Sequence, residues 1–185
     1  VLQLLSVVVV GIAVALMLIS PELVLIFGSP KYREAVYVIP PVAASVFFIF
    51  IYNILSMPQF YYEKTQFLMA ASMAAAGANV VLNFIFIRLF GYIAAGYTTL
   101  ACYMLYSVGH YIVSKQILVN EGIQENLMNP GFLVACSAFL IGASIICNLI
   151  FPYRILRYAI LLASAGLVFW KKELLLKTMA DIRKK

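Results

Sequence analysis

Charged residues are scarce in this sequence. Only 11% of its 185 residues are Asp, Glu, Lys or Arg, whereas 65% are hydrophobic. An ordinary soluble domain has about 25% charged and about 45–50% apolar residues. Because so little polar surface is available to coat a globule in water, the composition excludes a soluble fold.

Groups that could carry catalysis or bind a metal are also few. No Asp, Glu or Lys lies centrally in an apolar run, and the three cysteines have no CxxC spacing and no His or acidic residue nearby. A lone His without a second ligand holds no structural metal, and no nucleophile–base pair or phosphate-binding glycine loop is recognisable. We therefore expect no enzyme, no metal site and no cofactor.

Long apolar segments fill most of the chain instead. Each is close to the length of about 20 residues that crosses a bilayer as a helix, and no segment alternates with the period of a barrel strand. The sequence predicts an all-α, polytopic membrane protein with a bundle of six transmembrane helices over residues 1–170. The expected spans are 1–19, 36–56, 67–87, 93–114, 131–151 and 155–170.

Local signals set the expected limits of these spans. Ser20, Pro21 and Glu22 form a helix-start pattern, which predicts that the first span ends there and that a short interfacial helix runs to Phe27. The proline-containing stretch 57–66 is predicted to be a water-facing turn.

Small residues recur every four positions in the third expected span, at Ala70, Ala74 and Ala78. This spacing places them on one helical face, where small side chains permit the close approach of a neighbouring helix. We therefore expect this face to pack tightly.

The charges predict the orientation in the membrane. Six of the thirteen basic residues lie in residues 171–185, directly after the last apolar segment, and the net charge is +6. Such a tail is typical of the cytoplasmic flank of a span rather than of nucleic-acid binding. We expect a multi-pass protein of the plasma (inner) membrane with a cytoplasmic C-terminus. The turns carrying Lys31, Arg33, Arg88, Arg154 and Arg157 would then be external.

Two stretches resemble a known transporter superfamily. Residues 27–35 read FGSPKYREA and resemble a turn motif of the multidrug/oligosaccharidyl-lipid/polysaccharide exporters. Residues 79–99 contain NVVLN, FGYIAAG and TT, and resemble the NxxLNxxxIxxFGxxGAAxxT passage of polysaccharide transporters and Wzx-like O-antigen flippases. The sequence departs from that pattern with Ala94 in place of glycine.

The resemblance implies that the chain forms most of the C-terminal lobe of a MATE-like two-lobe transporter. Because the chain opens with Val1 inside an apolar run, we expect an N-terminal lobe of the same protein to precede it. The implied function is the flipping of a lipid-linked oligosaccharide by alternating access, with a polyprenyl-linked glycan as substrate, membrane lipids as surroundings and a coupling ion left open. Two alternatives remain: a cation-coupled exporter of drugs or small molecules from the same superfamily, and a membrane scaffold that transports nothing.

Polar side chains inside the spans are the candidates for a substrate cavity, because such groups need a partner or water when they lie in hydrocarbon. Four of them fall at i, i+4, i+7 and i+11 and so share one helical stripe, for which cavity lining and plain helix packing both remain open. Two asparagines four residues apart fit either interhelical hydrogen bonds or substrate contact. The candidates are Asn53, Asn79 and Asn83, and the stripe Thr99, Tyr103, Tyr106 and His110.

Overall fold

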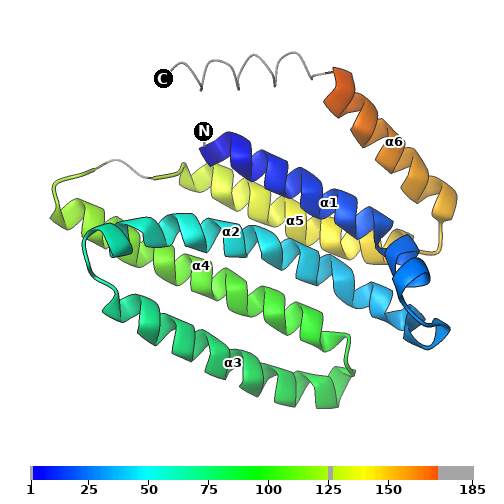
Figure 1. Ribbon diagram of the computed structural model, residues 1–185, viewed down its shortest axis with the longest axis horizontal. Coiled ribbons are helices and arrows are strands. Elements are labelled where there is room, and N and C mark those ends of the chain that lie inside the picture. The colour runs from blue at the N-terminus through cyan, green and yellow to red at the C-terminus, as the bar shows by residue number, and fades with distance from the viewer. Residues whose placement is uncertain (1, 125–126, 171–185) are drawn as a thin grey trace.

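The computed structural model describes residues 2–124 and 127–170, and every regular element in these ranges is a helix (Figure 1). The all-α prediction is therefore confirmed for the described residues. The elements are α1 (Leu2–Phe27), the 3₁₀ helix η1 (Pro30–Val38), α2 (Ile39–Tyr61), α3 (Gln66–Phe90), α4 (Ala94–Asn120), α5 (Pro130–Ile150) and α6 (Arg154–Trp170). The basic tail, on which the predicted orientation depends, lies outside the described residues.

Within residues 2–124 and 127–170, four stretches are long and apolar enough to cross a membrane: α1, the segment Lys31–Tyr61, α3 and α5. This is compatible with a membrane protein. The expectation of six spans is not confirmed, because α4 carries a polar stripe and the polar pair Lys115 and Gln116 one turn before its last, and the described part of α6 has only 17 residues, fewer than the roughly 20 needed to cross a bilayer.

The helices form an ordered stack with α2 at its centre (Figure 1). One side of α2 faces α1 and α5, and the other side packs against α4, with α3 beyond α4. Phe47 of α2, Met17 of α1 and Leu140 of α5 are fully buried in the core that these helices share. Helix α6 lies at the periphery and touches only a little of α1 and α5.

Short connections join neighbouring helices at the two ends of the stack. At one end, Gly91 ends α3 with φ +77°, a conformation that favours glycine, and the Tyr92 hydroxyl donates to Glu34 Oε2 of η1 at 3.0 Å. Desolvation and this hydrogen bond raise the pKa of Tyr92 above its ordinary value. At the other end, Lys64 pairs with Glu121 at 3.6 Å.

The sequence predicts that the first helix ends before Pro21. In the structure, α1 instead continues through Pro21 to Phe27. A proline inside a helix removes the hydrogen bond to the carbonyl four residues earlier, which here belongs to Met17. The Ser20 hydroxyl donates to that carbonyl at 2.7 Å. Local compensation of this kind makes an internal proline tolerable in an apolar setting, so the expected break is replaced by one continuous helix.

The expected turn at residues 57–66 is also shorter than predicted. Helix α2 runs through Pro58 to Tyr61, and the chain turns only between Tyr62 and Thr65. Pro58 and Gln59 are buried, so the last turn of α2 belongs to the packed interior rather than to a water-facing loop.

The predicted small-residue face does not pack tightly within the described chain. Ala70, Ala74 and Ala78 are exposed, whereas the half-buried residues of α3 include Ala71 and Ala75, one position further on. Ala74 and Ala78 border an apolar groove of about 250 Å³ between α3 and α4. The contact between these helices is made by the neighbouring face and by polar groups near both ends of α3.

Candidate functional site

The polar stripe predicted on α4 faces α2, where its aromatic members surround Tyr52. The ring centroids of Tyr106, His110 and Tyr103 lie 4.6, 5.8 and 6.3 Å from that of Tyr52, and Tyr106 and His110 are 4.4 Å apart. These separations are typical of favourable aromatic pairs. We call Tyr52, Tyr103, Tyr106 and His110 the aromatic cluster.

His110 is the most enclosed member of the aromatic cluster. Its side chain has no exposed surface, and its ring meets Phe67 of α3 edge-on at 5.5 Å. Its Nδ1 lies 2.8 Å from Gln59 Nε2 and 3.2 Å from Gln59 Oε1, and its Nε2 has no hydrogen-bond partner among the described residues. The ring of His110 is therefore enclosed by side chains of α2, α3 and α4.

Gln59 joins His110 to a second polar group. It too is fully buried, and its Nε2 donates to Ser114 Oγ at 3.1 Å, while the Ser114 hydroxyl donates to the Leu55 carbonyl. The sequence analysis missed Gln59 because it assigned residues 57–66 to a turn. A usable signal was present, since a helix extended through Pro58 places Gln59 one turn beyond Leu55.

The tyrosines of the aromatic cluster are only half-buried. The Tyr106 hydroxyl lies 2.6 Å from Ser72 Oγ of α3, so one tyrosine is tied to a third helix. Asn53, beside Tyr52 in the chain, is exposed, and its amide donates to the Ile49 carbonyl of its own helix at 2.7 Å. The cluster thus presents aromatic rings and a neighbouring amide at a partly open surface of α2 and α4.

The two candidate asparagines of α3 form a polar link to α4. Asn83 Nδ2 donates to Asn79 Oδ1 at 2.8 Å, and the Thr98 hydroxyl donates to Asn83 Oδ1 at 2.6 Å. The threonine in this link is Thr98 and not the predicted Thr99, which is half-buried and makes no side-chain hydrogen bond among the described residues. The geometry fits the interhelical bonding that the sequence left as one of two interpretations.

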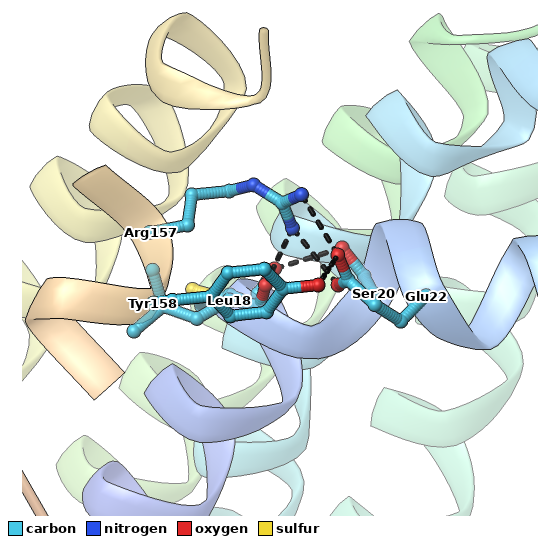
Figure 2. A network of polar contacts seen from close by, with 6 residues as sticks. Leu18, Ser20, Glu22, Arg157 and Tyr158 are labelled. Carbon is cyan, nitrogen blue, oxygen red and sulfur yellow. Dashed lines mark hydrogen bonds and ion pairs between the residues drawn. The ribbon is translucent and has the colours of Figure 1, made fainter. Parts of the chain in front are cut away.

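A charged network joins Arg157 of α6, which the sequence predicts in an external turn, to Glu22 of α1 (Figure 2). Arg157 is 1% exposed, and its Nη1 and Nη2 donate to the two carboxylate oxygens of Glu22 at 2.9 and 2.8 Å. Arg157 Nη1 also donates to the Leu18 carbonyl at 3.0 Å, and the Tyr158 hydroxyl donates to Glu22 Oε1 at 2.7 Å. The signal was a lone carboxylate in one apolar segment and an arginine one turn inside another.

An apolar cavity of about 400 Å³ lies between α2, α4 and α5. Its walls are formed by side chains such as Phe48, Met104 and Leu133, and the polar groups among them are the hydroxyls of Ser107, Tyr111 and Ser137. The Ser107 hydroxyl is not free to bind a ligand, because it already donates to the Phe48 and Tyr103 carbonyls, each at 2.9 Å. This cavity therefore offers volume for an apolar group but little to orient a polar one.

Comparison with known proteins adds no relative: no protein-family model, curated protein or solved structure matches this chain. The described residues define the molecule only by class, since their regular elements are all helices and four of their stretches are candidate membrane spans. Among the described residues, polar side chains gather in the aromatic cluster, in the charged network and in the link between Asn79, Asn83 and Thr98.

Proposed function

We propose that this chain is a helical lobe of a membrane transporter that flips lipid-linked oligosaccharides by alternating access. The observation that carries the proposal is the aromatic cluster between α2 and α4, in which three half-buried tyrosines gather beside a buried histidine. Polar groups inside a membrane are costly and usually mark a substrate pathway.

The chemistry of the cluster suits a sugar. Aromatic rings stack on the apolar faces of pyranose rings, and hydroxyl and amide groups exchange hydrogen bonds with sugar hydroxyls. Tyr52 and Tyr103 are nearly parallel, with 6° between their planes, and the exposed Asn53 lies beside Tyr52. Such sites in two-lobe transporters lie at the lobe interface, where one lobe rocks against the other.

A cation-coupled drug exporter has less support in the described helices. A cation would need carboxylates inside the spans, and α2, α3, α4 and α5 contain no Asp or Glu. The carboxylate of α1, Glu22, is already engaged by Arg157. A membrane scaffold would not need half-buried tyrosines between its helices. The translocation assay described next separates a scaffold from a transporter.

The test is translocation of a polyprenyl-diphosphate-linked glycan by the full-length protein in liposomes. We expect Tyr103→Ala to slow translocation by about threefold to tenfold, the effect of losing one or two aromatic contacts, while Tyr103→Phe is milder. Tyr153→Ala serves as the matched control, because Tyr153 is 64% exposed in the turn before α6.

Thiol labelling completes the test. Cys substitutions at Tyr103 and Tyr106 should react with water-soluble reagents in at least one transport state. Protection of both positions in both states, together with undiminished translocation in both alanine variants, would reduce the aromatic cluster to helix packing. Export of a cationic drug driven by an ion gradient, without glycan translocation, would favour the exporter.

A further inference from the structure

A second cavity lies at the end of the stack where α1, η1 and α6 meet. It has a volume of about 280 Å³, and five polar side chains line it together with apolar residues of α1 and η1. The polar residues are Glu22, Arg33, Arg154, Arg157 and Tyr158. Three guanidinium groups therefore share one small cavity with a single carboxylate.

The carboxylate neutralises only one of these arginines. Both oxygens of Glu22 accept hydrogen bonds from Arg157, and one accepts a further bond from Tyr158. Arg33 and Arg154 form no ion pair and no side-chain hydrogen bond within the described part of the chain. Two positive charges in the cavity thus lack a counter-charge.

Arg157 itself has an unused donor. Its Nε is buried and has no hydrogen-bond partner among the described residues, although both of its other nitrogens donate hydrogen bonds (Figure 2). Buried donors are nearly always satisfied in folded proteins. Arg157, which lines this cavity and is 1% exposed, therefore keeps one N–H without an acceptor among the described residues.

We propose that the cavity binds a phosphate group through Arg33, Arg154 and Arg157. Guanidinium groups donate paired hydrogen bonds to phosphate oxygens and suit this anion better than a lysine does. Arg154 is the first residue of α6, so the bound anion would also meet the N-terminal end of a helix, where unpaired backbone N–H groups favour negative charge. Glu22 takes the role of holding Arg157 in place.

Two sources could supply the phosphate. The cavity is formed by the last turns of α1 and the first turns of α6, which are at the head-group level if α1 spans the bilayer, so a phospholipid fits. A free phosphate or diphosphate in solution offers the same oxygens. Binding at this site requires no transport, so its test does not depend on the proposed function.

The experiment uses the full-length protein in phosphatidylcholine nanodiscs and two probes. Titration calorimetry measures binding of inorganic pyrophosphate, and native mass spectrometry measures retention of phosphatidic acid from nanodiscs containing that lipid. The variants are Arg33→Gln and Arg154→Gln, whose side chains make no bond that the fold would lose. The control is Arg88→Gln, which removes the same charge from α3, where Arg88 lies 3.8 Å over the Phe84 ring.

We expect each variant in the cavity to weaken binding by about tenfold, the loss of one charge-assisted contact, and Arg88→Gln to leave it unchanged. A preference for phosphatidic acid would identify a lipid head group, and a preference for pyrophosphate a soluble anion. Equal weakening by Arg88→Gln, unchanged binding in both cavity variants, or no binding of either probe to the wild-type protein would overturn the proposal.

Discussion

Two helices of this molecule contain an internal proline, and the two proline sites differ in the side chain that donates a hydrogen bond to the nearby backbone. In α1 the proline is Pro21, and in α2 it is Pro58. In each case, the carbonyl three residues earlier accepts a hydrogen bond from another helix. The donor is the charged Arg157 of α6 in the first case and the neutral Ser114 of α4 in the second.

The difference follows from how much else holds each pair of helices together. Helices α2 and α4 share the most extensive contact in the described structure, whereas α6 touches α1 over a small area. A neutral hydrogen bond is enough where packing already fixes the geometry. Where packing is sparse, the position of α6 depends on an ion pair that is almost fully buried on the arginine side.

The largest expected effect is therefore at the α1–α6 contact. Arg157→Leu leaves the Glu22 carboxylate and the Leu18 carbonyl without their main donor. Removing one member of a fully buried ion pair costs about 3–5 kcal/mol, and the loss should lie at the lower end of that range here because the Glu22 side chain is 25% exposed and keeps its hydrogen bond from Tyr158. We expect a clear fall in the unfolding temperature of the purified protein and faster proteolytic cleavage between α5 and α6.

The double variant Glu22→Leu/Arg157→Leu separates charge from packing. Replacing both ions by apolar groups is often neutral, so most of the lost stability should return. Arg154→Leu is the matched control, since Arg154 is exposed in the same helix. Equal unfolding temperatures for Arg157→Leu and Arg154→Leu would show that the ion pair does not hold α6.

The same comparison explains what the sequence could predict. The helical class followed from apolar runs and the lack of strand alternation, because these properties belong to each segment alone. The four residues of the polar stripe were assigned to one face of α4 by spacing, and three of them do meet at Tyr52.

Both internal prolines, by contrast, were predicted to break helices. The compensation at Pro21 is local, from Ser20 to the Met17 carbonyl, but the other donors come from helices far away in the sequence. No residue close to Pro58 in the sequence indicates that Ser114 donates to the Leu55 carbonyl. The prediction of which face of α3 packs against α4 was wrong for the same reason. That face is set by the hydrogen bonds of Ser72 and Asn83 to α4, and these partners cannot be read from the spacing of small residues.

Packing of α4 against α2 and η1 can be tested at Gly96, where the helices approach closely. A Cβ added at Gly96 of α4 would lie 2.8 Å from Pro41 Cγ and 3.0 Å from the Val38 carbonyl oxygen. Overpacking of this kind costs about 1–3 kcal/mol, so Gly96→Ala should lower the unfolding temperature measurably. Gly109→Ala is the control in the same helix, because its nearest neighbour, Phe67 Cζ, would be at an ordinary 3.6 Å. If both variants unfold alike, the close approach at Gly96 is not important for stability.

The smallest expected effect is that of the neutral polar cluster. Gln59→Leu removes the partner of His110 Nδ1 and one bond to Ser114, yet the Ser114 hydroxyl keeps its bond to the Leu55 carbonyl. Hydrogen bonds between membrane helices are worth about 0.6–1.7 kcal/mol, so the loss should be well below that of Arg157→Leu.

A double-mutant cycle with His110→Phe isolates the contact between Gln59 and His110, since the cost of Gln59→Leu should shrink when the histidine is already absent. Phenylalanine keeps the ring that packs against Tyr106 and Phe67, so the cycle reports the polar contact rather than a cavity. Unfolding temperatures of the four proteins in one detergent supply the measurement. A coupling as large as the loss caused by Arg157→Leu would show that polar contacts, and not packing, fix α4 against α2, and the contrast between the two proline sites would then disappear.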